Sequence, residues 1–198
     1  MKISLITLLL SICSVSFGQI TNYQNLLDTA FSGHNALFVY SKPLKITRLD
    51  SIEMQEYVEY IKEGSSQNLD TTMFSQIIHN SKLVDTTLWT DKELPGVLLI
   101  NENDETVSKK YVLQKLGLID DKKIKLYKKL INKFNSTEAK DRNLYYFSRP
   151  VFDNSKIFAI IQYDNGHSGL SGGGGIILYK LQYDKSWREF GIIDIWRY

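Results

Sequence analysis

The residue types best suited to chemistry gather between residues 164 and 175. This segment reads Asp164-Asn165-Gly166-His167-Ser168-Gly169-Leu170-Ser171 and continues with four glycines, Gly172–Gly175. Asp164, His167 and Ser168 are the residue types of a hydrolytic triad, in which a carboxylate orients a base and the base activates a hydroxyl. Glycine backbones can also approach a ligand closely and present N–H groups to an anion or oxyanion.

The same segment lacks features that these functions require. Known triads are assembled from separate elements, because neighbouring side chains in one turn seldom converge. Phosphate-binding glycine loops join a strand to a helix, whereas this segment joins two expected strands and has no P-loop lysine. Asp164 and His167 are only two potential metal ligands, and the other histidines, at 34 and 79, are far away in sequence. We interpret the segment as a wide hairpin connection, and assign no catalytic residue, metal ligand or cofactor.

A binding site at this turn remains the main candidate, together with two charged residues beside Pro150. Arg149 and Asp153 flank a proline-containing strand and could bind a ligand carboxylate or pair with each other. An ion-paired or surface arginine is the more ordinary role for such a residue. The candidate binding residues are Arg149, Asp153, Asp164, His167, Ser168, Ser171 and Gly172.

Four short motifs suggest covalent modification. They resemble the acceptor motif of a bacterial O-glycosylation system for exported proteins, in which an aspartate precedes a serine or threonine and an apolar residue follows. The alternative is that Asp-Thr and Asp-Ser pairs mark helix starts, which suits Asp50 and Asp70. The candidate acceptors are Thr29, Ser51, Thr71 and Thr86.

The N-terminus has the pattern of a cleavable export signal. Lys2 precedes an apolar run, Ile3 to Phe17, and no acidic residue occurs before Asp28. Small residues, Ser16 and Gly18, precede an expected cut before Gln19. The alternatives are an uncleaved anchor, for which the run is short, and lipidation of Cys13, which would need a small residue at position 12, where the chain has isoleucine.

We therefore expect a signal peptide over 1–18 and a single domain over 19–198. Cleavage would remove the only cysteine, which excludes disulfides and thiolate catalysis from the mature domain. The net charge of +2 falls to +1 without Lys2, so nucleic acid is not an expected partner. A single polypeptide of this length can bury one substantial core.

Hydrophobic periodicity predicts helices in the first two-thirds of the chain. The expected helices start near Thr21, near Asp50, near Met73 and at Asp121. In the last of them, lysines surround an apolar stripe of Ile124, Tyr127, Leu130, Ile131 and Phe134. Such a basic amphipathic helix could contact an anionic membrane or an acidic partner, and a solvated face is the plainer interpretation.

Strand patterns dominate the last 55 or so residues. After two earlier expected strands, Ala36 to Ser41 and Val97 to Ile100, four runs follow one another: Leu144 to Phe152, Ile157 to Asp164, Gly175 to Asp184 and Trp187 to Tyr198. We expect an antiparallel meander with a central second strand and a bulge near Gly191. The predicted fold is α+β, with N-terminal helices packed on an antiparallel sheet that the four-strand meander completes.

This C-terminal pattern resembles that of uncharacterised secreted proteins from Gram-negative bacteria. The resemblance rests on the segment from Phe147 to Phe152, a strand through Ala159, the glycine turn, Leu178-Tyr179-Lys180 and Trp187, about a quarter of the chain. Members often carry two cysteines at the positions of His167 and Ser171, so a disulfide or metal role is not implied here. The family has no established activity to transfer.

Together these patterns predict a non-catalytic binding or interaction domain of the periplasm or cell surface. Its expected partner is a peptide, a glycan or another protein, such as an exported toxin. Twelve tyrosines and three tryptophans would suit a sugar- or peptide-binding face, although strand packing accounts for most of them. The alternative is a small hydrolase with its site at 164–175.

Overall fold

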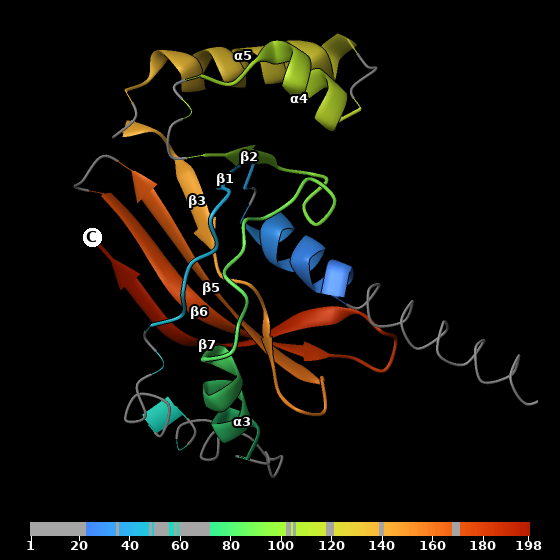
Figure 1. Cartoon of the computed structure of the whole chain (residues 1–198), viewed down its shortest axis with the longest axis vertical. Helices are drawn as coiled ribbons and strands as arrows, with labels where there is room; N and C mark the ends of the chain where they lie inside the picture. Colours follow the sequence, from blue (N-terminus) through green and yellow to red (C-terminus); the bar gives the residue numbers. More distant parts are fainter. Residues whose placement is uncertain are drawn as a thin grey trace, which may run out of the picture.

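The computed structural model describes residues 23–34, 36–47, 49, 56, 57, 59, 72–101, 104, 106–117, 121–138, 141–167 and 171–198. They form a mixed α+β fold in which one twisted sheet is flanked by helices (Figure 1). A first helix covers residues 23–33. The other elements are β1 (Phe38–Tyr40), α3 (Thr72–Ser81), β2 (Leu98–Ile100), α4 (Lys109–Lys115), α5 (Asp121–Ser136), β3 (Leu144–Phe147), β4 (Val151–Phe152), β5 (Phe158–His167), β6 (Ser171–Leu181) and β7 (Trp187–Arg197).

The sheet has the order β2-β1-β3-β5-β6-β7, and β4 also pairs with β5. Strand β1 runs parallel to both β2 and β3, whereas the remaining pairs are antiparallel. The expectation of a purely antiparallel sheet is therefore wrong for its N-terminal strands. Long connections containing helices join β1 to β2 and β2 to β3, and such crossovers allow neighbouring strands to be parallel.

The expected C-terminal meander is confirmed in its strand order, with one change. The run from Leu144 to Phe152 is divided into β3 and β4, which pair with different parts of β5. Between them the Ser148 N–H donates to the Gln162 carbonyl, and the Gln162 N–H donates to the Ser148 hydroxyl at 2.9 Å. Pro150 has no N–H to continue the ladder. Strand β5 is central, as expected from its apolar residues on both faces.

Each face of the central strands packs against its own hydrophobic cluster. The helix over 23–33 covers one face with Leu26, Leu27 and Phe31. Helix α3 covers the other face, where Met73, Phe74 and Ile77 contact residues of β4, β5 and β6. Burial on both faces explains the run Ile160-Ile161 in β5 and Ile176-Ile177-Leu178 in β6, all of which are buried.

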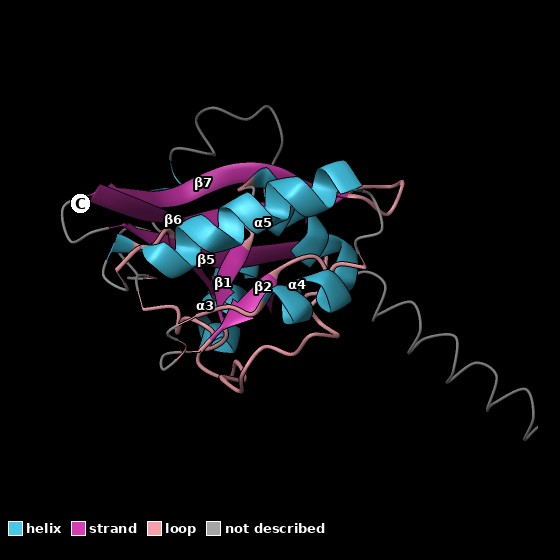
Figure 2. Ribbon diagram, turned by 90° about the horizontal axis from the view of Figure 1, so that it is seen from above, coloured by secondary structure: helices cyan, strands magenta, loops and turns pink. Residues whose placement is uncertain are grey.

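A third cluster joins α4 and α5 to the parallel strands. Ile131 and Phe134 of α5 and Val112 of α4 pack with Leu98 and Ile100 of β2. The two helices form an outer layer at the β1–β2 end of the sheet (Figures 1 and 2). The expected α5 stripe is corrected at Leu130, whose side chain is 37% exposed.

The glycine run belongs to a strand, which corrects the expected wide turn. Gly172–Gly175 lie within β6 and pair with β5 and β7. They allow large rings to lie across the strand: a Cβ at Gly174 would be 2.6 Å from Cε2 of Trp196, and one at Gly175 would be 3.1 Å from Cε1 of Tyr163. Close approach, and not ligand contact, explains these glycines in the described structure.

Three expected helices and an expected bulge are confirmed. The helices are the one over 23–33, α3 and α5, and β7 has bulges on both sides of Gly191. Helix α4 was not expected; it begins after Ser108, whose hydroxyl accepts the Tyr111 N–H at 3.1 Å.

Two predictions fall on residues that the structure does not describe. Of the helix expected to start near Asp50 only residues 56, 57 and 59 are described, and the export signal lies outside the described residues. Within the described segments, no helix is long and apolar enough to cross a membrane.

Candidate binding site

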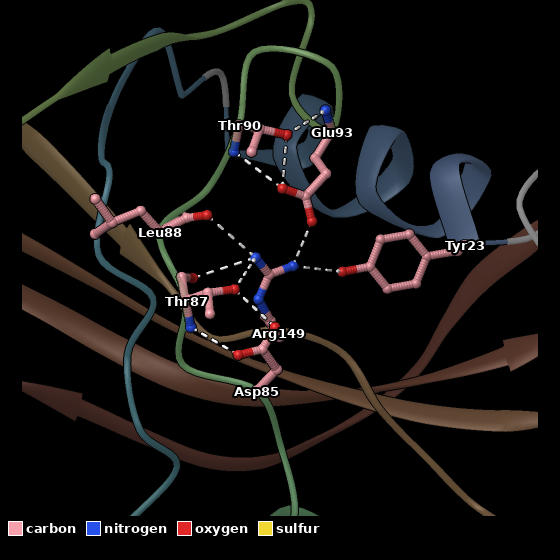
Figure 3. Close-up of polar contacts among 7 residues, drawn as sticks. All are labelled: Tyr23, Asp85, Thr87, Leu88, Thr90, Glu93 and Arg149. Atoms are coloured by element: carbon pink, nitrogen blue, oxygen red, sulfur yellow. Dashed lines mark hydrogen bonds and ion pairs between the residues drawn. The ribbon is translucent and has the colours of Figure 1, made fainter.

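Arg149 lies at the centre of a polar network between the sheet and the segment 85–93 (Figure 3). Its guanidinium pairs with the Glu93 carboxylate and donates to the Tyr23 hydroxyl at 3.3 Å. It also donates to the backbone carbonyls of Thr87 at 3.2 Å and Leu88 at 3.4 Å. The guanidinium carbon lies 4.4 Å from the centroid of a Trp89 ring, in cation–π geometry.

The opposite charges of Glu93 and Arg149 stabilise each other in this network. Burial acts to raise the pKa of Glu93, but Arg149 and the Thr90 donors outweigh it and lower that pKa. Thr90 donates from its backbone N–H at 2.9 Å and its hydroxyl at 2.8 Å to the Glu93 oxygen that Arg149 leaves open. Burial acts to lower the pKa of Arg149, and its bonds to Glu93 and Tyr23 raise it overall. Both side chains are therefore held charged at neutral pH.

This arrangement makes Arg149 a positioning residue for the segment 85–93. Both terminal guanidinium nitrogens are engaged within the chain, and the buried Nε has no hydrogen-bond partner among the described residues. Only 11% of its side chain is exposed, which leaves little surface for a ligand. The ion-pair partner of Arg149 is Glu93 and not Asp153.

Asp153 closes the turn between β4 and β5. Its Oδ1 accepts the backbone N–H groups of Ile157 and Phe158, each at 3.0 Å, and Oδ2 accepts the Ser155 hydroxyl. Lys156 adopts a left-handed φ of 58° in the same turn. Asp153 is 5% exposed, so its carboxylate serves the turn and not an open binding surface.

The other expected site residues lie along the β5–β6 hairpin. The Asp164 carboxylate accepts the Tyr198 hydroxyl at 2.9 Å, while His167 and Ser171 are backbone partners across the hairpin. Gly172 lies in β6, and its carbonyl accepts the Tyr198 N–H at 3.1 Å. Ser168 lies outside the described residues. The structure therefore engages Asp164 of β5 with Tyr198.

Two of the four candidate glycosylation sites fall within the described structure. Thr29 is inside the first helix, and its hydroxyl donates to the Asn25 carbonyl at 2.8 Å. Thr86 is exposed in an extended segment, next to Asp85, whose carboxylate accepts the Thr87 N–H at 2.8 Å. Ser51 and Thr71 lie outside the described residues. Thr86 is thus the more exposed acceptor of the two, since Thr29 is half-buried.

A polar cleft lies where the parallel strands β1 and β2 end. Ser41 directly follows β1 and Asn101 directly follows β2. Ligands of sheets with parallel strands commonly bind beyond the carboxyl ends of those strands. The cleft has a volume of about 480 Å³ and is lined by Ser41, Leu88, Trp89, Asp91, Leu99, Asn101, Asp104, Thr106, Val107, Ser108 and Tyr111.

The Arg149 network fixes one wall of this cleft. Leu88 and Trp89, which Arg149 contacts, both line it. The Trp89 N–H donates to the Ser41 carbonyl at 2.8 Å, which ties this wall to the end of β1. Helix α4 also contributes to the lining, through Tyr111. Arg149 therefore acts on the cleft indirectly, by holding a wall in place.

The polar side chains of the cleft are oriented by one another. Ser41 donates to the Asn101 amide oxygen at 2.7 Å. Asp104 accepts from the Asn101 backbone N–H at 2.7 Å and from its amide nitrogen at 3.1 Å. On the α4 side, Asp91 pairs with Lys115 and accepts the Tyr111 hydroxyl at 3.3 Å. Burial and the nearby Asp91 charge raise the pKa of Tyr111, so its hydroxyl stays protonated as a donor.

This set of groups suits a neutral, hydroxyl-rich ligand. The cations next to the lining residues are engaged within the chain. Lys115, whose side chain is 5% exposed, is paired with Asp91. Arg149 stacks on Trp89 and is paired with Glu93, and Arg142 donates to the Asp104 carbonyl at 3.1 Å. Carboxylate and amide oxygens accept hydrogen bonds from hydroxyl groups, and the exposed Leu88 and the Tyr111 ring offer apolar contact. An anionic ligand would meet the carboxylates of Asp91 and Asp104.

Sequence patterns did not single out these cleft residues. Ser41 and Asn101 lie at the ends of two expected strands. These positions would predict a ligand-binding cleft only if the two strands were known to be neighbouring and parallel. Asp91 and Tyr111 belong to a loop and to an unexpected helix. No group of three or more metal-binding side chains occurs in the part of the chain that the structure describes.

Comparisons with known proteins identify no relative of this chain. No protein-family model matches the chain, and neither curated proteins nor solved structures give a match.

Proposed function

We propose that this chain is an exported, non-catalytic binding domain of the periplasm or cell surface, and that it binds a neutral glycan in the cleft at the carboxyl ends of β1 and β2. The observation that carries the proposal is the convergence of Ser41, Asn101, Asp104 and Tyr111 on that cleft. These side chains come from three separate segments, namely the end of β1, the turn after β2 and helix α4. A shared concave site is the usual setting of ligand recognition.

The polar groups support binding more than hydrolysis. Glycoside hydrolysis needs one carboxyl group that delivers a proton and a second that acts as base or nucleophile. In this cleft Asp104 accepts twice from Asn101, and Asp91 accepts from Lys115 and Tyr111, so both act as hydrogen-bond acceptors. The alternative hydrolase site at 164–175 has less support, because Asp164 is bonded to Tyr198.

A glycan array tests the proposal with the chain starting at Gln19, which keeps every described residue. We expect retention of a neutral oligosaccharide and a loss of affinity of about fivefold or more for Asn101→Ala, because one hydrogen bond contributes about 1 kcal/mol. Asn132→Ala is the matched control, since it removes an exposed amide from α5 and leaves the cleft intact.

The array also separates the alternatives. Absence of any neutral glycan ligand would contradict the proposed substrate class. Equal loss of binding in Asn101→Ala and Asn132→Ala would contradict the cleft as the site. Release of shortened oligosaccharides during incubation would replace the non-catalytic interpretation with a hydrolytic one, and Asp91→Asn and Asp104→Asn would then identify the carboxylates involved.

Export is tested by intact-mass measurement of the protein recovered from a Gram-negative host. We expect a chain that begins at Gln19, because Ser16 and Gly18 fit the small-residue requirement of signal cleavage. Gly18→Leu is expected to block the cut, whereas Gln19→Ala should not. A wild-type chain that retains Met1 would contradict export by cleavage.

The same mass spectrum tests glycosylation of Thr86. A sugar on this residue would add to the mass of the wild-type chain, and Thr86→Ala would remove that addition.

A further inference from the structure

We propose that the solvent face of α5 binds the surface of an anionic lipid bilayer. This lysine–leucine face is defined as Lys122, Leu126, Lys129, Leu130 and Lys133. Their spacing of i, i+4, i+7, i+8 and i+11 places all five on one side of a helix. The proposal is independent of the glycan cleft, which α4 lines and α5 does not.

The opposite side of α5 already completes the fold. Ile131 is 1% exposed and Phe134 is 5% exposed, and both pack in the cluster with Leu98. The Phe134 ring also stacks on Phe38, with a centroid separation of 4.2 Å. The helix is therefore held by its buried side. Leu130 lies at the edge of that side, where it lines a pocket with Phe38 and Phe134, and Leu126 lies outside the cluster.

Those leucines are unusually exposed. Leu126 is 57% exposed and Leu130 is 37% exposed. They are four residues apart, so they form neighbouring contacts on the helix surface. Apolar side chains at the centre of a polar helix face can enter the boundary between lipid headgroups and acyl chains.

Charge complementarity selects the bilayer as the occupant. The sequence of α5 contains six lysines and one acidic residue, Asp121. All six lysine side chains are exposed, and Lys129 and Lys133 lie beside Leu126 around the helix, at i+3 and i+7. Lysines beside an anionic bilayer are attracted to its surface, and leucines among them add apolar burial. A nucleic acid would use the lysines but would leave the leucines without a suitable partner.

The position of α5 permits this contact. The helix lies in the outer layer of the molecule, lengthwise across the β1–β2 end of the sheet (Figures 1 and 2). Its 16 residues span about 24 Å. A helix placed in this way can lie flat on a bilayer while the sheet remains in water.

Vesicle sedimentation tests the proposal with the chain starting at Gln19. The probes are vesicles of phosphatidylcholine alone and vesicles that also contain phosphatidylglycerol. We expect binding to the anionic vesicles only, weakened by salt. The double variant K129Q/K133Q should bind at least tenfold more weakly, because each lysine near the surface contributes about fivefold. K45Q/K82Q has the same charge change away from α5 and should bind like the wild type.

A second pair of variants tests the apolar contribution. Leu126→Ala is expected to weaken binding several-fold, whereas Leu83→Ala, at a residue 73% exposed elsewhere, should not. Equal effects of the paired variants, absent vesicle binding, or equal binding to both vesicle types would each overturn the proposal. Retention by a nucleic acid that is insensitive to Leu126→Ala, without vesicle binding, would reassign the face. Circular dichroism confirms that each variant is folded.

Discussion

Replacement of Arg149 by methionine is expected to lower the free energy of unfolding by about 3 kcal/mol. The substitution keeps an unbranched apolar stem but leaves the partly buried Glu93 carboxylate without its cationic partner. It also leaves the backbone carbonyls of Thr87 and Leu88 without the guanidinium N–H groups that donate to them. Chemical denaturation measured by circular dichroism gives the value, and a change below about 0.5 kcal/mol would contradict the importance of this network.

Two further variants separate charge from geometry. Arg149→Lys keeps the charge but loses the planar fork that reaches Glu93 and the carbonyls together, so we expect only partial recovery. Arg149→Met combined with Glu93→Leu removes both charges and should be less destabilising than Arg149→Met alone, because no buried carboxylate is left unpaired. A double variant as unstable as the sum of its parts would mean that the two residues do not interact.

The same network predicts a dependence of stability on pH. Because folding lowers the pKa of Glu93, the stabilisation is fully present above its usual value of 4.5 and is lost as the pH falls through the lower folded value. We expect the wild type to lose stability below about pH 4.5 more steeply than Glu93→Gln does. Parallel acid profiles for the two proteins would contradict the contribution of Glu93.

Replacement of Gly174 by alanine is expected to destabilise the fold by about 2 kcal/mol. The added Cβ would lie 2.6 Å from Cε2 of Trp196 and would also meet the Tyr163 carbonyl oxygen, which belongs to the backbone of β5. A backbone atom in a central strand cannot move without disturbing the β5–β6 ladder. Thermal and chemical denaturation measure the effect.

Gly33→Ala is the matched control for Gly174→Ala. No atom lies within 4 Å of the position that its Cβ would occupy, and the residue ends the first helix. We expect a neutral or slightly stabilising effect there, since alanine lowers the entropy of the unfolded chain. Similar destabilisation by both substitutions would show that the rings across β6 do not explain the glycines.

The elements that follow from local pattern were predictable, while their pairing was not. The apolar stripe of α5 and the two-faced apolar run of β5 each depend on side chains within one segment, so periodicity identifies them. Parallel pairing of β1 with β2 and β3 depends on residues about 60 and 106 positions apart, as in Val39 with Leu99 and with Tyr145. Nothing in a single segment encodes that choice.

The candidate site shows the same division. Arg149 and Asp153 were recognised as noteworthy from residue type, but their partners come from positions that local pattern does not connect, such as Glu93, 56 residues from Arg149. Residue type also singles out the glycine run, but the prediction of a wide turn was wrong. The ring of Trp196, which requires a glycine at position 174, is distant from it in sequence. The cleft at Ser41 and Asn101 appears only when β1 and β2 are adjacent.

A proton–nitrogen NMR titration with the glycan selected on the array tests most directly whether the cleft is the binding site. We expect the largest shifts at the backbone amides of Ser41, Asn101, Asp104 and Tyr111, with little change at Gly172–Gly175. The same titration of Asn101→Ala should need at least fivefold more glycan to produce them. Shifts confined to the β5–β6 hairpin, or no shifts at saturating glycan, would contradict the proposed site.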